Sequence, residues 1–149
     1  MIPRRGLRGL AVALFMACAA MAATPVAQAD PTGAQSALTA VTSQGTGRVI
    51  VSPTSAGQGT FDARVKVTIH NAAPNTTFTV TRAVDQPADG SCTSTDFVTV
   101  ATLTTSAGGA GAVEFERSGG PTIAFDLFLR VIGGDGTVLE SECMVIIGK

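Results

Sequence analysis

The chain has 149 residues, of which 45% are hydrophobic and only 14% are charged, and its formal net charge is −1. With few charges and no run of like sign after residue 29, the sequence offers no basic patch for nucleic acid or an anionic membrane. Trp and Tyr are both absent, so the flat surfaces on which sugars commonly stack are missing. These features favour a neutral or apolar partner, either an unknown protein or a small apolar ligand.

Residues 1–29 have the layout of a secretory signal peptide, with a basic start, an apolar run over residues 10–23 and an A-x-A cleavage site ending at Ala29. We expect the mature chain to start at Asp30 and to be secreted or held in the periplasm or cell envelope. The alanine-rich composition is typical of bacteria. Two alternatives stay open: lipidation of Cys18 in a lipobox-like segment, and export by the twin-arginine route.

Residues 30–45 are rich in Ser, Thr, Gly, Ala and Gln and have no sustained periodicity. We expect them to form a flexible leader, followed by one domain over residues 46–149. A short strand within 36–41 that pairs with a sheet edge is an alternative, but such a strand is marginal without partners.

Alternating hydrophobic and polar residues predict strands through this domain. The clearest stretches are 61–70, FDARVKVTIH, and 122–132, TIAFDLFLRVI. A period of two indicates a strand with one face on a core and the other in water. The seven predicted strands cover residues 47–53, 61–70, 76–84, 97–105, 112–117, 122–132 and 137–147.

The alternation in the last two strands makes specific predictions about single side chains. Asp126 and Arg130 fall on the outer face of their strand, where we expect them to meet water. Phe128 shares that face and is therefore either covered by the leader or an exposed apolar contact. In 137–147 the pattern places Cys143 on the inner face.

Short strands, turns rich in Gly and Pro, and the lack of any helical period predict an all-β fold, a seven-stranded antiparallel immunoglobulin-like sandwich. The segment 133–136, GGDG, is a tight hairpin signal. The missing Trp excludes an antibody-type domain, which packs that residue on its disulfide.

Cys92 and Cys143 are the only cysteines left after cleavage. An even number in an exported chain predicts a disulfide, here joining a loop to the last strand. Its loop of about 50 residues corresponds to roughly 4 kcal/mol of stabilisation in the chain-entropy model. Two separately buried thiols are the alternative.

The polar segment 85–96 contains Asp85, Asp89 and Asp96. Carboxylates and neighbouring carbonyls are calcium ligands, but this spacing matches no calcium motif, and Asp and Gly are ordinary turn residues. We expect a plain loop, with these three aspartates and Phe128 as candidate contact residues for a partner.

Residues for catalysis are scarce. His70 is the only histidine and no G-x-S-x-G motif is present, so neither a serine triad nor a catalytic zinc or copper site is indicated. The pairs Glu114/Glu116 and Glu140/Glu142 are interpreted as solvated strand neighbours rather than as glycosidase carboxylates. We expect no enzyme activity, no cofactor and no metal.

Residues 49–117 read VIVSPTSAGQG, a strand, AAPNTTFTVTRAV, a cysteine-bearing loop and TVATLTTSAGGAGAVEF. This layout resembles the small secreted immunoglobulin-like domains of bacteria, including the neocarzinostatin group of enediyne-antibiotic apoproteins. The resemblance covers about half of the mature chain and implies a secreted immunoglobulin-like fold. The chain has one potential bridge where that group has two, and no ligand-pocket residue carries over.

The function that we expect from the sequence is an exported, non-enzymatic β-sandwich that binds a partner through Phe128 or the 85–96 loop. One alternative is a carrier of a small apolar ligand, with a cleft lined by Phe97 and Phe128. A secreted enzyme is the other alternative, with few acid–base residues to support it.

Overall fold

The computed structural model describes residues 33–54, 61–119 and 124–147. The predicted signal peptide and the alternative at Cys18 lie outside these residues. The described part of the chain is all-β, with nine strands where the sequence predicts seven. They are β1 (Ala34–Thr42), β2 (Thr46–Thr54), β3 (Phe61–His70), β4 (Thr77–Asp85), β5 (Val98–Thr104), β6 (Gly111–Gly119), β7 (Ala124–Gly133), β8 (Val138–Ser141) and β9 (Met144–Ile147).

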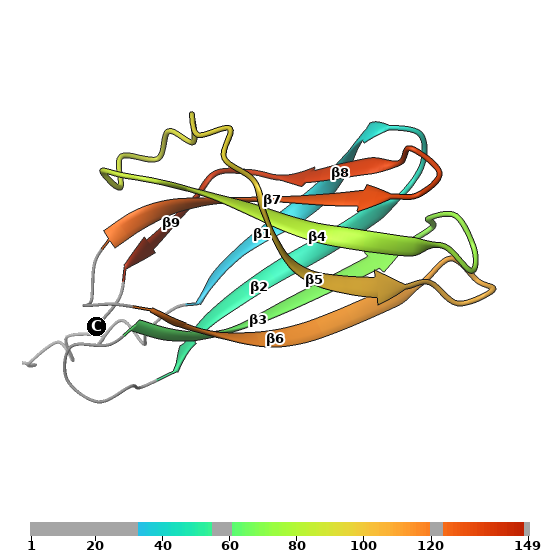
Figure 1. Ribbon diagram of the computed structural model, residues 1–149, viewed down its shortest axis with the longest axis horizontal. Coiled ribbons are helices and arrows are strands. Elements are labelled where there is room, and N and C mark those ends of the chain that lie inside the picture. The colour runs from blue at the N-terminus through green and yellow to red at the C-terminus, as the bar shows by residue number, and fades with distance from the viewer. Residues whose placement is uncertain (1–32, 55–60, 120–123, 148–149) are drawn as a thin grey trace, which may run out of the picture.

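All described strand pairs are antiparallel, and they form one sheet in the order β5-β4-β7-β8-β1-β2-β3-β6, with β9 also paired to β7. The sheet folds over, so that β4 and β7 face β2, β3 and β6 (Figure 1). The edge strands β5 and β6 meet beside the turn that joins them and diverge away from it (Figure 1). The sheet is therefore nearly closed. The described residues contain no helix that could cross a membrane.

Strand β1 overturns the expectation of a flexible leader over 30–45. It pairs with β2 on one side and β8 on the other, and Leu38 is 1% exposed beneath it. The alternative of a strand within 36–41 is confirmed, but the strand lies inside the sheet rather than at its edge. Ser36 and Leu38 do alternate with outward residues, but small side chains give this pattern little hydrophobic contrast.

The predicted last strand, 137–147, is in fact two strands separated by Glu142 and Cys143. The backbone N–H of Glu142 donates to Ser36 Oγ at 2.8 Å, and the interruption exchanges the two faces of the chain. Met144 and Ile146 are consequently buried, whereas Val145 and Ile147 are exposed. The predicted inward alternation through Cys143 is therefore wrong beyond Ser141, and Cys143 is half-buried.

The inner faces of the two layers form one hydrophobic core. The predicted alternation in β3 is confirmed, because the side chains of residues 63, 65, 67 and 69 are buried. In β7 the core side chains are Leu127, Leu129 and Val131, as predicted. The hairpin predicted from GGDG is also present: β7 pairs with β8, and the turn is closed by Gly136 N–H donating to Gly133 O at 3.1 Å.

Candidate functional site

The loop after β4 is organised by Asp85. Its Oδ2 accepts hydrogen bonds from the backbone N–H groups of Ser94, at 2.6 Å, and Thr93, and from the Thr93 hydroxyl at 3.1 Å. The Ser94 and Thr93 amides hold the pKa of Asp85 below its usual range, since they stabilise the carboxylate. This carboxylate is therefore occupied within its own loop.

Asp126 is fully buried, and the prediction that it faces water is wrong. Its Oδ2 accepts three backbone N–H donors from the loop, Asp89 at 3.0 Å, Gly90 at 2.9 Å and Ser91 at 3.1 Å. The loop thus covers the outer face of β7 at this point. A single carboxylate satisfies three successive amides and fixes the loop to the strand.

The aspartates of the 85–96 loop do not converge on one point. Asp89 Oδ1 accepts from the Ser91 N–H at 2.9 Å in a local turn, and Asp96 is exposed. Among the described residues no group of three His, Cys, Asp or Glu side chains could hold a metal ion. The described residues therefore contain no cluster of ligands for the calcium site that the sequence left as an alternative.

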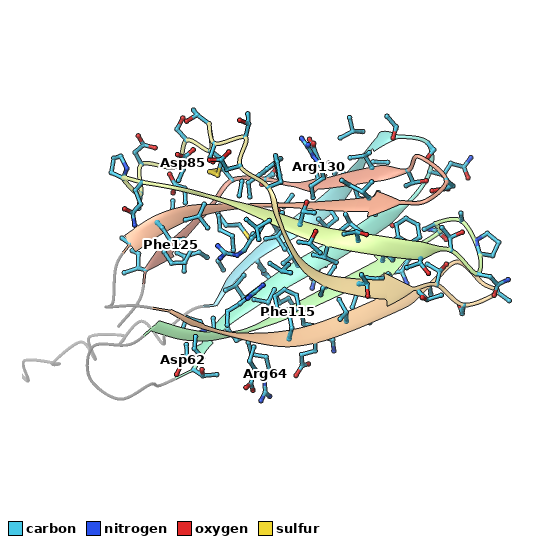
Figure 2. All side chains as sticks on the ribbon, in the orientation of Figure 1. Asp62, Arg64, Asp85, Phe115, Phe125 and Arg130 are labelled. Atoms are coloured by element: carbon cyan, nitrogen blue, oxygen red, sulfur yellow. A yellow bond between two sulfur atoms is a disulfide. The ribbon has the colours of Figure 1, made fainter. Side chains whose placement is uncertain are left out.

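The predicted disulfide between Cys92 and Cys143 is present, with the two Cα atoms 5.6 Å apart. It joins the loop to the connection between β8 and β9 (Figure 2). Together with Asp126, this bridge fixes the loop at two points.

Phe128 is half-buried, so it is not a free apolar surface. The ring that covers it comes from Phe97 rather than from the 30–45 segment. The ring of Phe97 packs on it edge to face, with the centroids 5.9 Å apart. Arg130 in turn places its Cζ 4.2 Å from the Phe97 centroid and binds Glu140 through Nη2 at 2.6 Å. The two phenylalanines expected to line a ligand cleft therefore pack against each other.

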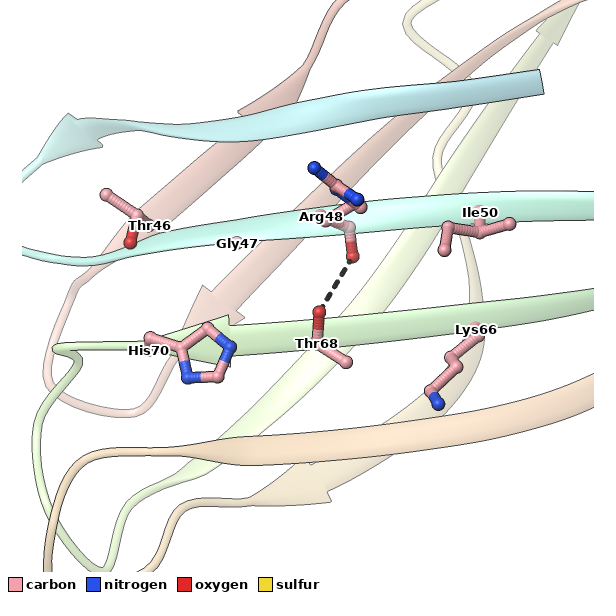
Figure 3. A pocket seen from close by; sticks show the side chains of 7 residues that line it. All are labelled: Thr46, Gly47, Arg48, Ile50, Lys66, Thr68 and His70. Atoms are coloured by element: carbon pink, nitrogen blue, oxygen red, sulfur yellow. Dashed lines mark hydrogen bonds between the residues drawn. The ribbon is translucent and has the colours of Figure 1, made fainter.

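A groove of about 450 Å³ lies on the outer face of β2 and β3. Its lining is drawn in Figure 3 and consists of Thr46, Gly47, Arg48, Ile50, Lys66, Thr68 and His70. The strand register explains the hollow. Arg48 lies opposite Thr68, and this row continues outward to Ala37 on β1 and Ala112 on β6. Short side chains flank the longer Arg48 and Lys66 and leave space between them.

The groove gathers positive charge that has no ion-pair partner among the described residues. Arg64, next along β3, binds Glu114 at 3.3 Å and Glu116 at 3.0 Å. By contrast, no ion pair forms at Arg48 or Lys66 within the described part of the chain, and His70 is exposed at the end of β3. The sequence pattern missed this cluster, because only the register of β2 on β3 brings these residues together.

The arrangement lacks the geometry of a hydrolase within the described residues. Among the described residues, the His70 side chain has no hydrogen bond to a neighbouring acid or nucleophile. The carboxylates of Glu114 and Glu116 are engaged by Arg64.

No protein-family model, curated protein or solved structure matches the chain. The fold and the groove define a disulfide-bonded all-β protein with a cationic surface hollow.

Proposed function

We propose that this protein is an exported, non-enzymatic binding module whose β2–β3 groove receives an acidic segment of a partner protein. The observation that carries the proposal is the cluster of Arg48 and Lys66, without an ion-pair partner among the described residues, beside the exposed His70 around a hollow on the outer face of β2 and β3. Export is inferred from the signal-peptide pattern and from the disulfide. An immunoglobulin-like relationship stays a prediction from the order of strands and turns.

Charge complementarity supports an acidic occupant. An extended peptide projects alternate side chains to one side, so acidic residues at every second position would meet the cations of the groove. The hydroxyl of Thr46 offers a hydrogen bond beside them, and Ile50 offers an apolar contact, whereas the Thr68 hydroxyl already donates to the Arg48 carbonyl oxygen at 3.5 Å. The proposal replaces the neutral or apolar partner that composition alone favours.

The test is binding of a fluorescein-labelled octapeptide, (Glu-Thr)4, measured by fluorescence anisotropy, with (Gln-Thr)4 as the uncharged probe. We expect the double substitution Arg48→Glu, Lys66→Glu to weaken binding by about tenfold or more, and added salt to weaken wild-type binding. Arg130→Gln, which removes an already paired cation on β7, is the matched control and should bind as wild type. The proposed binding of an acidic segment in the groove is wrong if both peptides bind equally, or if the double variant binds the acidic peptide as tightly as wild type.

A further inference from the structure

Two arginines point into the space between the layers from opposite sides. Arg82 on β4 lies directly opposite Leu129, and Arg117 on β6 lies opposite Ala63. Both opposing residues are buried in the core. Because directly opposed residues of an antiparallel pair project from the same face, both arginine side chains project toward the interior.

Neither of these arginines has a counter-charge among the described residues. The Nε atoms of Arg82 and Arg117 are buried without a hydrogen-bond partner, and neither guanidinium forms an ion pair there. Asp62, which also has a buried unpartnered oxygen, lies on the outer side of its layer together with Arg64 (Figure 2). Burial, and then the charge of Arg117, lower the pKa of Arg82.

The surroundings of the pair are apolar yet open to solvent. Val98 on edge strand β5 lies opposite Arg82 and is 57% exposed. β5 and β6 are the two ends of the sheet, and no pairing closes the gap between their described residues. Phe115 and Val100 pack on the core nearby, and Arg117 Cζ is 5.9 Å from the centroid of the Phe115 ring. Arg82 therefore lies beside one edge strand of the sheet, and Arg117 lies on the other.

We propose that Arg82 and Arg117 form an anion site between the two layers, which binds an oxyanion bridging both guanidiniums. Two like charges facing an apolar interior are costly when alone, whereas a shared carboxylate or phosphate gives each guanidinium charge-assisted, forked hydrogen bonds. The chemistry fits either a free inorganic anion or the head group of a carboxylate whose apolar body rests on Phe115 and Val100. The site is separate from the outer groove, because it lies on the other face of the layer.

The test is thermal unfolding of the whole protein at constant ionic strength, in chloride and with added inorganic phosphate, acetate or decanoate. Phosphate stabilises proteins in general, so the measured quantity is the difference between wild type and Arg82→Met or Arg117→Met. We expect a saturable rise in wild-type Tm, and a dissociation constant weaker by about 10- to 100-fold in each variant. Arg130→Met removes a cation on β7 that is already paired with Glu140 and should respond as wild type.

The choice of added anion distinguishes the two possible ligands, a free inorganic anion and a carboxylate with an apolar body. Decanoate binding much more tightly than acetate identifies a carboxylate with an apolar body, whereas phosphate binding best identifies a free anion. If a Met variant fails to fold, Arg82→Lys and Arg117→Lys keep the charge and remove the fork, and we expect them to bind the anion more weakly than wild type. The proposal is overturned if no anion raises the wild-type Tm, or if the variants respond as wild type does.

Discussion

The guanidinium of Arg130 lies over the ring of Phe97, with Cζ 4.2 Å from the ring centroid. One residue comes from β7 and the other from the end of the long loop, so the contact fixes the loop as it enters β5. Phe97 completes the arrangement by packing edge to face on Phe128. This region of the outer face is therefore a small satellite core, held together without residues of the main core.

The Phe97–Phe128 pair is expected to be energetically coupled. In a double-mutant cycle of Phe97→Ala and Phe128→Ala, measured by urea unfolding, the coupling should be about 0.5–1.5 kcal/mol, since edge-to-face rings contribute beyond their buried area. Pairing Phe97→Ala with Val145→Ala, whose side chain is exposed on β9, is the control and should be additive. A vanishing coupling between the two phenylalanines contradicts the packing described.

Removal of the Asp126 carboxylate is expected to destabilise the fold by about 2–4 kcal/mol, because three backbone donors lose a charged acceptor. Asp126→Ala, followed by urea unfolding, measures this loss. Asp89→Ala is the matched control, since that exposed carboxylate accepts one local hydrogen bond, and it should cost less than about 1 kcal/mol. Similar losses in the two variants would mean that Asp126 does not hold the loop.

The disulfide closes a sequence separation of 51 residues. Cys92→Ser, Cys143→Ser should therefore lower the free energy of unfolding by about 4 kcal/mol in the chain-entropy model. Chemical reduction of the wild type should give the same unfolding midpoint as the double variant. If reduction leaves the midpoint unchanged, the two sulfurs are not bonded in the protein.

Lowering the pH is expected to decrease the stability of the protein, because protonation of Asp85 weakens the hydrogen bonds that this carboxylate accepts within the 85–96 loop. Its pKa is lowered from 3.8 by hydrogen bonds that exist only in the folded state, so its stabilisation is complete above about pH 5 and is lost as the pH falls through the lowered folded value. Asp85→Asn removes this contribution at neutral pH. The difference in urea midpoint between wild type and variant should thus be largest near pH 7 and close toward pH 2. A difference that is constant with pH contradicts the assignment.

The internal position of β1 predicts sensitivity where a leader would tolerate change. Leu38→Ala should cost about 2–4 kcal/mol in urea unfolding, because it leaves a cavity under a strand paired on both sides. Val41 lies on the same strand and is 59% exposed, so Val41→Ala should cost little. Equal and small effects at both positions would favour a leader after all.

The alternation in 61–70 and in the part of 122–132 that lies in β7 was enough to predict two central strands, because β-branched, leucine or aromatic residues contrast with polar or charged neighbours at most positions. The paired cysteines and the GGDG turn were equally local signals. β1 was predicted only as a marginal alternative to a leader, because Ser36, Ala37 and Thr39 provide no such contrast. The change of face at Glu142 was hidden for a related reason: Val145 and Ile147 are hydrophobic but point outward.

Sequence alone thus determined the all-β class, which depends on short-range alternation, and the disulfide, which follows from two cysteines in a chain with an export signal. Tertiary structure decided which polar residues matter. Asp126 is buried only because a loop remote in sequence folds over it, and Arg48 joins Lys66 only through the register of β2 on β3. Arg82 and Arg117 project toward one interior because two layers pack, and layer packing is a long-range consequence of core burial that no local pattern contains.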